Sequence, residues 1–311
     1  MRVCHLITHN PDTIGGIETV ALELGRGYDI KWIGSGGIFS IIKGFIIALK
    51  LRFSNYDIIH AHDNAGYWCS YLTKNKILVY TDHGFWQDYF DVNQPSSLRK
   101  KIESKILVRM QNRMIKYFDN VVPITNDISD KLKKYYNVLP YNVIHNGVDA
   151  KKFHPLRTSK KFDYIWIGTN AGSKRLKESI ELVANQNKKL LVIGVSGKST
   201  DKIKYISSVK RAEMHNTLNL AKTFVYFNKQ KAYSLALLEA MACGLNIVTN
   251  DYILSELTKE GTIDGTVYLD NEPKKVVKLN GKLARKIVEK ELDWNMIRNK
   301  YKRFYQTLIN R

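Results

Sequence analysis

Several histidines in this sequence stand where apolar runs end, which is where side chains can reach a ligand. His83 follows such a run and precedes Gly84, so it could enter a cleft, although a hydrogen-bonded histidine fits the same position. His60 and His62 are two residues apart and would point the same way from a strand, as metal ligands can. Because no carboxylate or cysteine cluster accompanies them, we expect no metal site.

Two glycines, Gly15 and Gly16, follow the first apolar run and precede a helical pattern. Glycines there let the backbone approach a ligand closely, and the N–H groups of the helix start could meet an anion. A simple tight turn would use the same residues. The spacing is not the GxGxxG of dinucleotide-binding proteins, so it does not support a nicotinamide cofactor.

A second glycine-rich turn, residues 168–173, is followed by Lys174 and Arg175 at the expected start of a helix. Cations at a helix N-terminus oppose the helix dipole. An anion such as a diphosphate bound between them would offset that cost, and we favour this interpretation over a solvated surface pair.

The segment 231–248 carries the strongest signal. Glu239 lies inside a short apolar helical pattern, where a carboxylate without polar partners would cost several kcal/mol. Sugar hydroxyls would satisfy it. The backbone N–H groups at Ser234 and Leu235 would open that helix toward a phosphate.

Short apolar runs that alternate with helical patterns must position these residues. Such alternation predicts parallel sheets with helices on both faces. In the first half the expected strands are 3–8, 30–33, 57–60, 77–81, 120–124 and 141–144. In the second half they are 162–168, 190–194, 224–228 and 245–249, with helices at 174–185, 235–243 and 295–309.

The restart of this pattern predicts two doubly wound α/β domains facing each other. The polar segment 147–161, which follows the turn His145-Asn146-Gly147, is the expected linker. Ligands bind beyond the carboxyl ends of the strands in such sheets. The site is therefore expected in the cleft between the two domains.

Composition narrows the class of protein. The chain has 311 residues, of which 44% are hydrophobic, and this excludes a largely disordered chain. A net charge of +20 attracts polyanions, which include nucleotides, nucleic acid and anionic membranes. Three cysteines without a CxxC pair favour a reducing compartment. The longest apolar stretch, 38–51, is interrupted by Lys43 and Lys50 and is too short to span a bilayer. We therefore expect a cytoplasmic protein that can touch a membrane but not cross it.

Taken in order, these motifs resemble the retaining glycosyltransferases of family 4, which have the GT-B fold of two Rossmann-like domains. The resemblance rests on Gly-Gly-Ile-Glu at 15–18, His-Ala-His at 60–62, Asp-His-Gly at 82–84, Asn-Gly-Val-Asp at 146–149 and Leu-Leu-Glu-Ala-Met-Ala-Cys-Gly at 237–244. It implies an acceptor-side domain at 1–155, on which a helix at about 295–311 packs back. Residues 156–294 would form the donor domain.

The family transfers a sugar from a nucleotide donor with retention at the anomeric carbon and without an essential metal or other cofactor. By resemblance, His83 would lie by the donor sugar and the incoming hydroxyl as the catalytic residue. Glu239 would bind the ribose of a donor expected to be UDP- or GDP-linked, with the base near 205–209. The residues expected around the diphosphate and sugar are Gly15, Gly16, Thr169, Lys174, Arg175, Lys231, Ser234 and Leu235.

Two positions depart from the family pattern. Lys231 stands where the family usually has a glutamate that contacts the sugar, and Thr169 stands where it often has an arginine. These changes leave open a non-catalytic GT-B module that binds a nucleotide or another polyanion. A second enzyme alternative with the same fold is a sugar-nucleotide epimerase. A nucleic-acid partner is not expected, because no nucleic-acid-binding motif is present.

The acceptor is not named by any motif; a glycan, a lipid-linked sugar and a protein all fit. Apolar residues recur every fourth position in the basic segment 98–116, from Leu98 to Met114. This is either a core-facing helix with a solvated basic face or a surface for anionic lipid, which the segment 38–51 could join.

Overall fold

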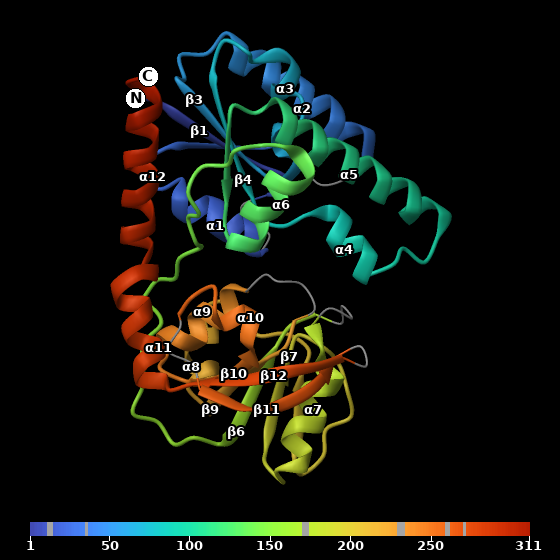
Figure 1. Ribbon diagram of the computed structural model, residues 1–311, viewed down its shortest axis with the longest axis vertical. Coiled ribbons are helices and arrows are strands. Elements are labelled where there is room, and N and C mark those ends of the chain that lie inside the picture. Colours follow the sequence, from blue (N-terminus) through green and yellow to red (C-terminus); the bar gives the residue numbers. More distant parts are fainter. Residues whose placement is uncertain (11–14, 35–36, 170–173, 229–233, 259–261, 270–271) are drawn as a thin grey trace. The chain divides into compact units, whose positions relative to one another are not determined.

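The computed structural model describes residues 1–10, 15–34, 37–169, 174–228, 234–258, 262–269 and 272–311. The chain divides into two compact units, Met1–Asn146 with Trp294–Arg311, and Gly147–Asp293 (Figure 1). The first unit thus ends where the expected linker begins, ahead of residue 155, where the family resemblance placed the end of the first domain. The reason is that Phe153, within that polar segment, is buried in the core of the second unit.

The first unit contains a five-stranded parallel sheet with the strand order β2-β1-β3-β4-β5. Its strands are β1 (Val3–Ile7), β2 (Asp29–Trp32), β3 (Ile58–His62), β4 (Ile77–Asp82) and β5 (Asn120–Pro123). Its helices are α1 (Gly16–Leu24), α2 (Gly37–Arg52), η1 (Asp63–Gly66), α3 (Cys69–Leu72), α4 (Trp86–Val92), α5 (Leu98–Tyr117), α6 (Asn126–Tyr136) and α12 (Trp294–Ile309).

The two faces of this sheet are covered differently. One face packs apolar residues such as Leu6 and Ile59 against Ala48 of α2 and Met114 of α5. The other face carries histidines, and α12 meets them with tyrosine side chains such as Tyr305. The apolar face is an ordinary core, whereas the histidine face is a buried polar network.

The second unit contains a seven-stranded sheet with the order β11-β12-β10-β9-β6-β7-β8. Its strands are β6 (Phe162–Ile167), β7 (Leu190–Ile193), β8 (Ile203–Ile206), β9 (Ala221–Tyr226), β10 (Asn246–Asn250), β11 (Thr262–Leu269) and β12 (Glu272–Leu279). Its helices are α7 (Leu176–Asn185), α8 (Met214–Leu218), α9 (Leu235–Ala242), α10 (Asp251–Leu254), α11 (Gly281–Ile287) and the π-helical turn η3 (Val288–Leu292). β8 and the antiparallel hairpin β11–β12 are additions that the alternation of short apolar runs did not predict.

One expected strand, residues 141–144, is not a strand in the structure. Tyr141 N–H donates to the carbonyl of Val121 at 2.8 Å, and Ile144 N–H donates to that of Pro123 at 3.1 Å. The segment thus runs beside β5. A parallel ladder would also need an N–H returned from position 123, and proline has none to give.

Candidate active site

Sheet order in the first unit gathers the histidines on one face. β1, β3 and β4 are neighbours, and the register pairs His5 with His60 and His62 with Thr81. His83 follows directly after β4. Since carboxyl ends of parallel strands meet at one edge, His62 and His83 come together there, with His83 partly exposed.

Three imidazoles form a hydrogen-bonded row, called here the histidine row: His5, His62 and His83. Nδ1 of His5 lies 3.0 Å from Nε2 of His62, and Nδ1 of His62 lies 3.1 Å from Nε2 of His83. Successive ring planes differ by only 17° and 29°. In each of the two bonds one imidazole donates and the other accepts. The row runs from the buried middle of the sheet to the partly exposed His83.

His60 lies beside the row and stacks on His62, with ring centroids 4.4 Å apart. Its Nδ1 bonds the hydroxyl of Tyr305 at 2.5 Å, and its Nε2 bonds that of Thr81 at 2.7 Å. Candidate metal-binding atoms of His5, His60 and His62 lie within 4.8 Å of one another. Hydrogen bonds already engage both nitrogens of His60 and of His62, so the network accounts for this spacing by itself.

Burial makes the histidines neutral at pH 7. It lowers the pKa of His5 to about 3 and that of His83 to about 4, and it lowers the pKa of His60 and His62 well below the ordinary range. A neutral imidazole donates one hydrogen bond and accepts another. His83 can therefore orient a hydroxyl, but it carries no positive charge at neutral pH.

Asp82, next to His83, is also buried, but its pKa shifts in the opposite direction to that of the histidines. Burial raises its carboxyl pKa to about 7, although its Oδ1 accepts hydrogen bonds from the N–H of Gly84 at 2.9 Å and from Nε2 of Gln111 at 3.3 Å. Gln111 also donates to the carbonyl of Gly84 at 2.9 Å. These bonds fix the turn that presents His83.

These shifts predict how stability responds to pH. The unfolded chain protonates its histidines below pH 6.5, whereas the histidine row and His60 stay neutral in the native state. Each of these four histidines therefore lowers the free energy of unfolding as the pH falls. Asp82 has a raised pKa, so its contribution is complete at low pH and is lost as the pH rises toward about 7. Its effect on the pH dependence of unfolding therefore cancels that of about one histidine. We expect the urea-derived free energy of unfolding to fall between about pH 6.5 and 5.

The variant Asp82→Asn provides the control for this prediction. Removing the offsetting carboxyl should make the decline of unfolding free energy with falling pH steeper. A wild-type stability that is flat or rises over the same interval would show that the native histidines take up protons.

The Gly-Gly-Ile-Glu motif begins α1, but its first glycine already has a neighbour. A Cβ on Gly15 would lie 1.9 Å from Oε2 of Glu18, whereas one on Gly16 would meet nothing within 4 Å. Glu18 is buried, and its Oε1 lies 2.7 Å from Nδ1 of His9. Gly15 thus makes room for a carboxylate of its own chain, and only Gly16 leaves open space for a ligand.

In the second unit, the central strands β6 and β9 lie side by side, with connections leaving in opposite directions. The loops after these two strands hold the predicted donor residues. Lys174 donates from Nζ to the hydroxyl of Tyr226 at 3.3 Å, which links the loop after β6 to the end of β9. Thr169 is exposed, and Lys231 lies outside the described residues.

The helix starts in this region differ in their caps. Ser234 caps α9, and its hydroxyl accepts a hydrogen bond from the N–H of Leu237 at 3.4 Å, so the helix begins at Leu235 as predicted. Arg175 precedes α7 with a left-handed backbone, φ 51°, and its Nη1 donates to Glu178 at 2.9 Å. The Arg175 guanidinium is therefore paired, through Nη1, with a carboxylate of its own helix start.

Glu239 is buried on α9, and its partner is a cation that sequence reasoning missed. Its Oε1 pairs with Nη1 of Arg211, whose guanidinium also lies 5.2 Å from the ring of Phe153. Burial raises the pKa of Glu239, and the charges of Arg211 and Lys152 oppose that rise. A third of the Arg211 side chain is exposed, so the pair can meet a ligand from the solvent side.

Sequence reasoning also missed His5, Thr81 and the tyrosines of α12. His5 occupies an inward position of β1, two residues before the strand ends, and this was the available signal. Arg211 has no comparable signal, because it lies 28 positions before Glu239 in a stretch without a motif.

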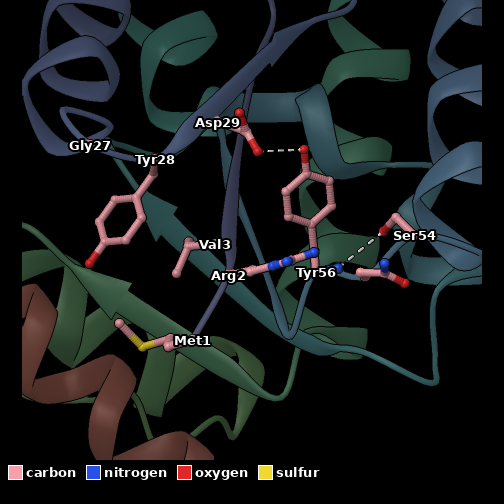
Figure 2. A pocket seen from close by; sticks show the side chains of 9 residues that line it. Met1, Arg2, Val3, Gly27, Tyr28, Asp29, Ser54 and Tyr56 are labelled. Atoms are coloured by element: carbon pink, nitrogen blue, oxygen red, sulfur yellow. Dashed lines mark hydrogen bonds between the residues drawn. The ribbon is translucent and has the colours of Figure 1, made fainter.

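A pocket on the first unit lies at the opposite end of the strands. Figure 2 shows that it is lined by Arg2 at the start of β1, by Asp29 and by Tyr56, whose hydroxyl donates to Asp29 at 2.7 Å. Strands begin here rather than end, and none of the residues predicted for the site lines this pocket.

Comparisons with known proteins identify the class. Residues 30–152 match the model of "Glycosyltransferase Family 4", and residues 148–303 match that of "Glycosyl transferases group 1". An uncharacterized glycosyltransferase from Methanocaldococcus jannaschii is 20% identical over 91% of this chain and 76% of its own length.

Solved structures share the fold. Sucrose-phosphate synthase from Thermosynechococcus elongatus is 13% identical, superposes with a TM-score of 0.78 and covers 99% of both chains. An alpha-glucosyltransferase solved with UDP and a 13-mer DNA is also 13% identical, with a TM-score of 0.58 over 81% of this chain and 80% of its own. Two Rossmann-like units in this order form the GT-B fold. The chain belongs to the family 4 glycosyltransferases.

Proposed function

We propose that this glycosyltransferase moves a sugar from a nucleotide-sugar donor, UDP- or GDP-linked, to an acceptor hydroxyl. The anomeric configuration would be retained, and no metal would be required. The alpha-glucosyltransferase with the same fold was solved with UDP, which supports a nucleoside diphosphate as the leaving group.

The observation that carries the proposal is the group of residues after β6 and β9. Lys174, after β6, donates to Tyr226, the last residue of β9. α9 starts shortly after β9 in the chain, with a Ser234 cap and a buried Glu239 one turn further on. A cation and a helix N-terminus suit a diphosphate, and a carboxylate suits ribose hydroxyls. The Arg211 guanidinium pairs with Glu239 and opposes the rise in its pKa, so it would help to keep the carboxylate in place for that task.

In the proposed reaction, the bond between the anomeric carbon and the diphosphate oxygen breaks. The acceptor oxygen bonds to the same face of the carbon, and the acceptor proton passes to the departing diphosphate. Negative charge accumulates on the diphosphate, where Lys174 and the N–H groups of Leu235 and its neighbours would stabilise it. These groups would supply the stabilisation that a divalent metal provides elsewhere.

His83 would act on the sugar and the acceptor as a neutral group. Its lowered pKa leaves it uncharged at pH 7, which suits a hydrogen bond to a hydroxyl better than donation of a proton. The histidine row fixes the ring through Nε2. Gly16 would let the donor approach the start of α1.

A thermal-shift screen against UDP, GDP, ADP and their sugar conjugates, with EDTA or with magnesium, tests the donor. A nucleotide at about 100 times its dissociation constant should add ~2.7 kcal/mol of stability. We expect one base to stabilise the protein equally with and without the metal. Product NMR of the anomeric proton then tests retention.

Other outcomes favour the alternatives. Stabilisation without turnover on any acceptor would favour a binding module, and conversion of the sugar without an acceptor would favour an epimerase. Stabilisation that requires magnesium would contradict metal independence.

A further inference from the structure

Helix α2 turns small residues inward and large apolar residues outward. Gly44 and Ala48 are buried, Gly44 next to the Trp68 side chain, and Leu51 is buried in the same apolar core as Ala48. The large side chains that remain 40% to 51% exposed are Ile41, Ile42, Phe45, Ile46 and Leu49. Phe53, just past the helix end, is 77% exposed. A soluble helix normally has the reverse arrangement.

These exposed side chains form one stripe rather than scattered contacts. At 100° per residue, positions 41, 42, 45, 46, 49 and 53 fall within an arc of about 140°. A contiguous apolar surface of this kind marks an interaction site.

Charge around the stripe has a single sign. α2 contains Lys43, Lys50 and Arg52 and no acidic residue. The stripe is therefore apolar in its middle and cationic at its margins, as in helices that lie in a membrane interface.

Helix α5 carries a second exposed apolar stripe, in its first half. Leu98, Ile102 and Ile106 are exposed, whereas Met114 at the other end of its apolar stripe is buried in the core. Only the first half of the predicted lipid-facing stripe is therefore available. The exposed cations around it are Arg99, Lys100, Lys101, Lys105 and Arg109, against the single acid Glu103.

The two helices cover the same face of the sheet. Ala48 of α2 and Met114 of α5 belong to one apolar core, and α3 contacts both helices (Figure 1). We propose that the exposed side of α2 and the first half of α5 form a docking surface for the headgroup region of an anionic lipid bilayer.

The positive charge of both helices favours an anionic bilayer over a second copy of the chain as the binding partner. A second copy of the chain would bring the same cations to the interface and repel. An anionic bilayer supplies phosphates for the cations and acyl chains for the isoleucines. Among the described residues no helix is long and apolar enough to cross a bilayer, so the chain would lie on the surface. This docking needs no donor and does not depend on the sugar transfer.

Vesicle sedimentation tests the docking surface. We expect the wild type to bind vesicles of phosphatidylcholine with phosphatidylglycerol at least about tenfold more tightly than vesicles of phosphatidylcholine alone. The triple variant Ile42→Gln, Ile46→Gln and Leu49→Gln should weaken the binding about tenfold. Because these side chains are exposed and glutamine favours helices, the urea midpoint should not change.

The matched control removes three exposed apolar side chains elsewhere in the same unit, with Leu139→Gln, Met296→Gln and Ile309→Gln. It should keep wild-type vesicle binding. Equal loss in both triple variants, or no preference for the anionic vesicles, would overturn the proposal. A wild-type dimer that the α2 variant converts to a monomer would assign the surface to a second copy instead.

Discussion

His83→Gln is expected to lower kcat by about 100-fold or more while leaving the fold intact. The imidazole is the partly exposed end of the histidine row and, in the proposed function, contacts the sugar and the incoming hydroxyl. Glutamine can still hydrogen-bond Nδ1 of His62, so the buried part of the row keeps a partner. The loss should therefore appear in turnover rather than in stability.

Steady-state kinetics with the donor identified by the thermal-shift screen measures this effect. His154→Gln is a matched control, because His154 is also half-buried but lies in the other unit, where its Nδ1 bonds the carbonyl of Lys151 at 3.0 Å. It should turn over at the wild-type rate. If His83→Gln also keeps kcat within about twofold, the residue has no part in the reaction.

Glu239→Gln should weaken donor binding by about tenfold to a hundredfold. A hydrogen bond to a charged group contributes ~1.5–3 kcal/mol, and ~1.4 kcal/mol corresponds to a factor of ten. The amide keeps the size of the side chain and can still accept from Arg211, whose partly exposed guanidinium can also be hydrated. Folding stability should therefore fall much less than affinity.

Calorimetric titration of the nucleoside diphosphate checks this prediction, with the exposed Glu213→Gln in the same unit as a control. Arg211→Gln separates the two roles of the pair. It leaves the carboxylate buried without its cation, so it should cost more stability than Glu239→Gln but less donor affinity. Unchanged donor affinity in Glu239→Gln would make the residue a structural partner of Arg211 only.

The chain positions of the site residues follow from local sequence. The apolar helical pattern predicts a helix that starts at Leu235, and α9 starts there. His83 after an apolar run predicts a strand end, and β4 ends at Asp82. The hairpin β11–β12 escaped prediction because the parallel pattern of its neighbours gave no reason to expect antiparallel pairing.

The strand ends, the helix start at Leu235 and the alternation of strand and helix patterns are local properties, because each depends on residues a few positions apart. The sequence alone therefore determined them. Which side chains become hydrogen-bond partners depends on the lateral order and the register of the strands, and no local sequence pattern encodes either. His5 meets His62 across 57 positions only because β1 lies beside β3. Likewise, the apolar stretch 38–51 is visible in the sequence, but only tertiary packing decided that Gly44 and Ala48 are buried, with Gly44 beside Trp68, while its isoleucines remain exposed.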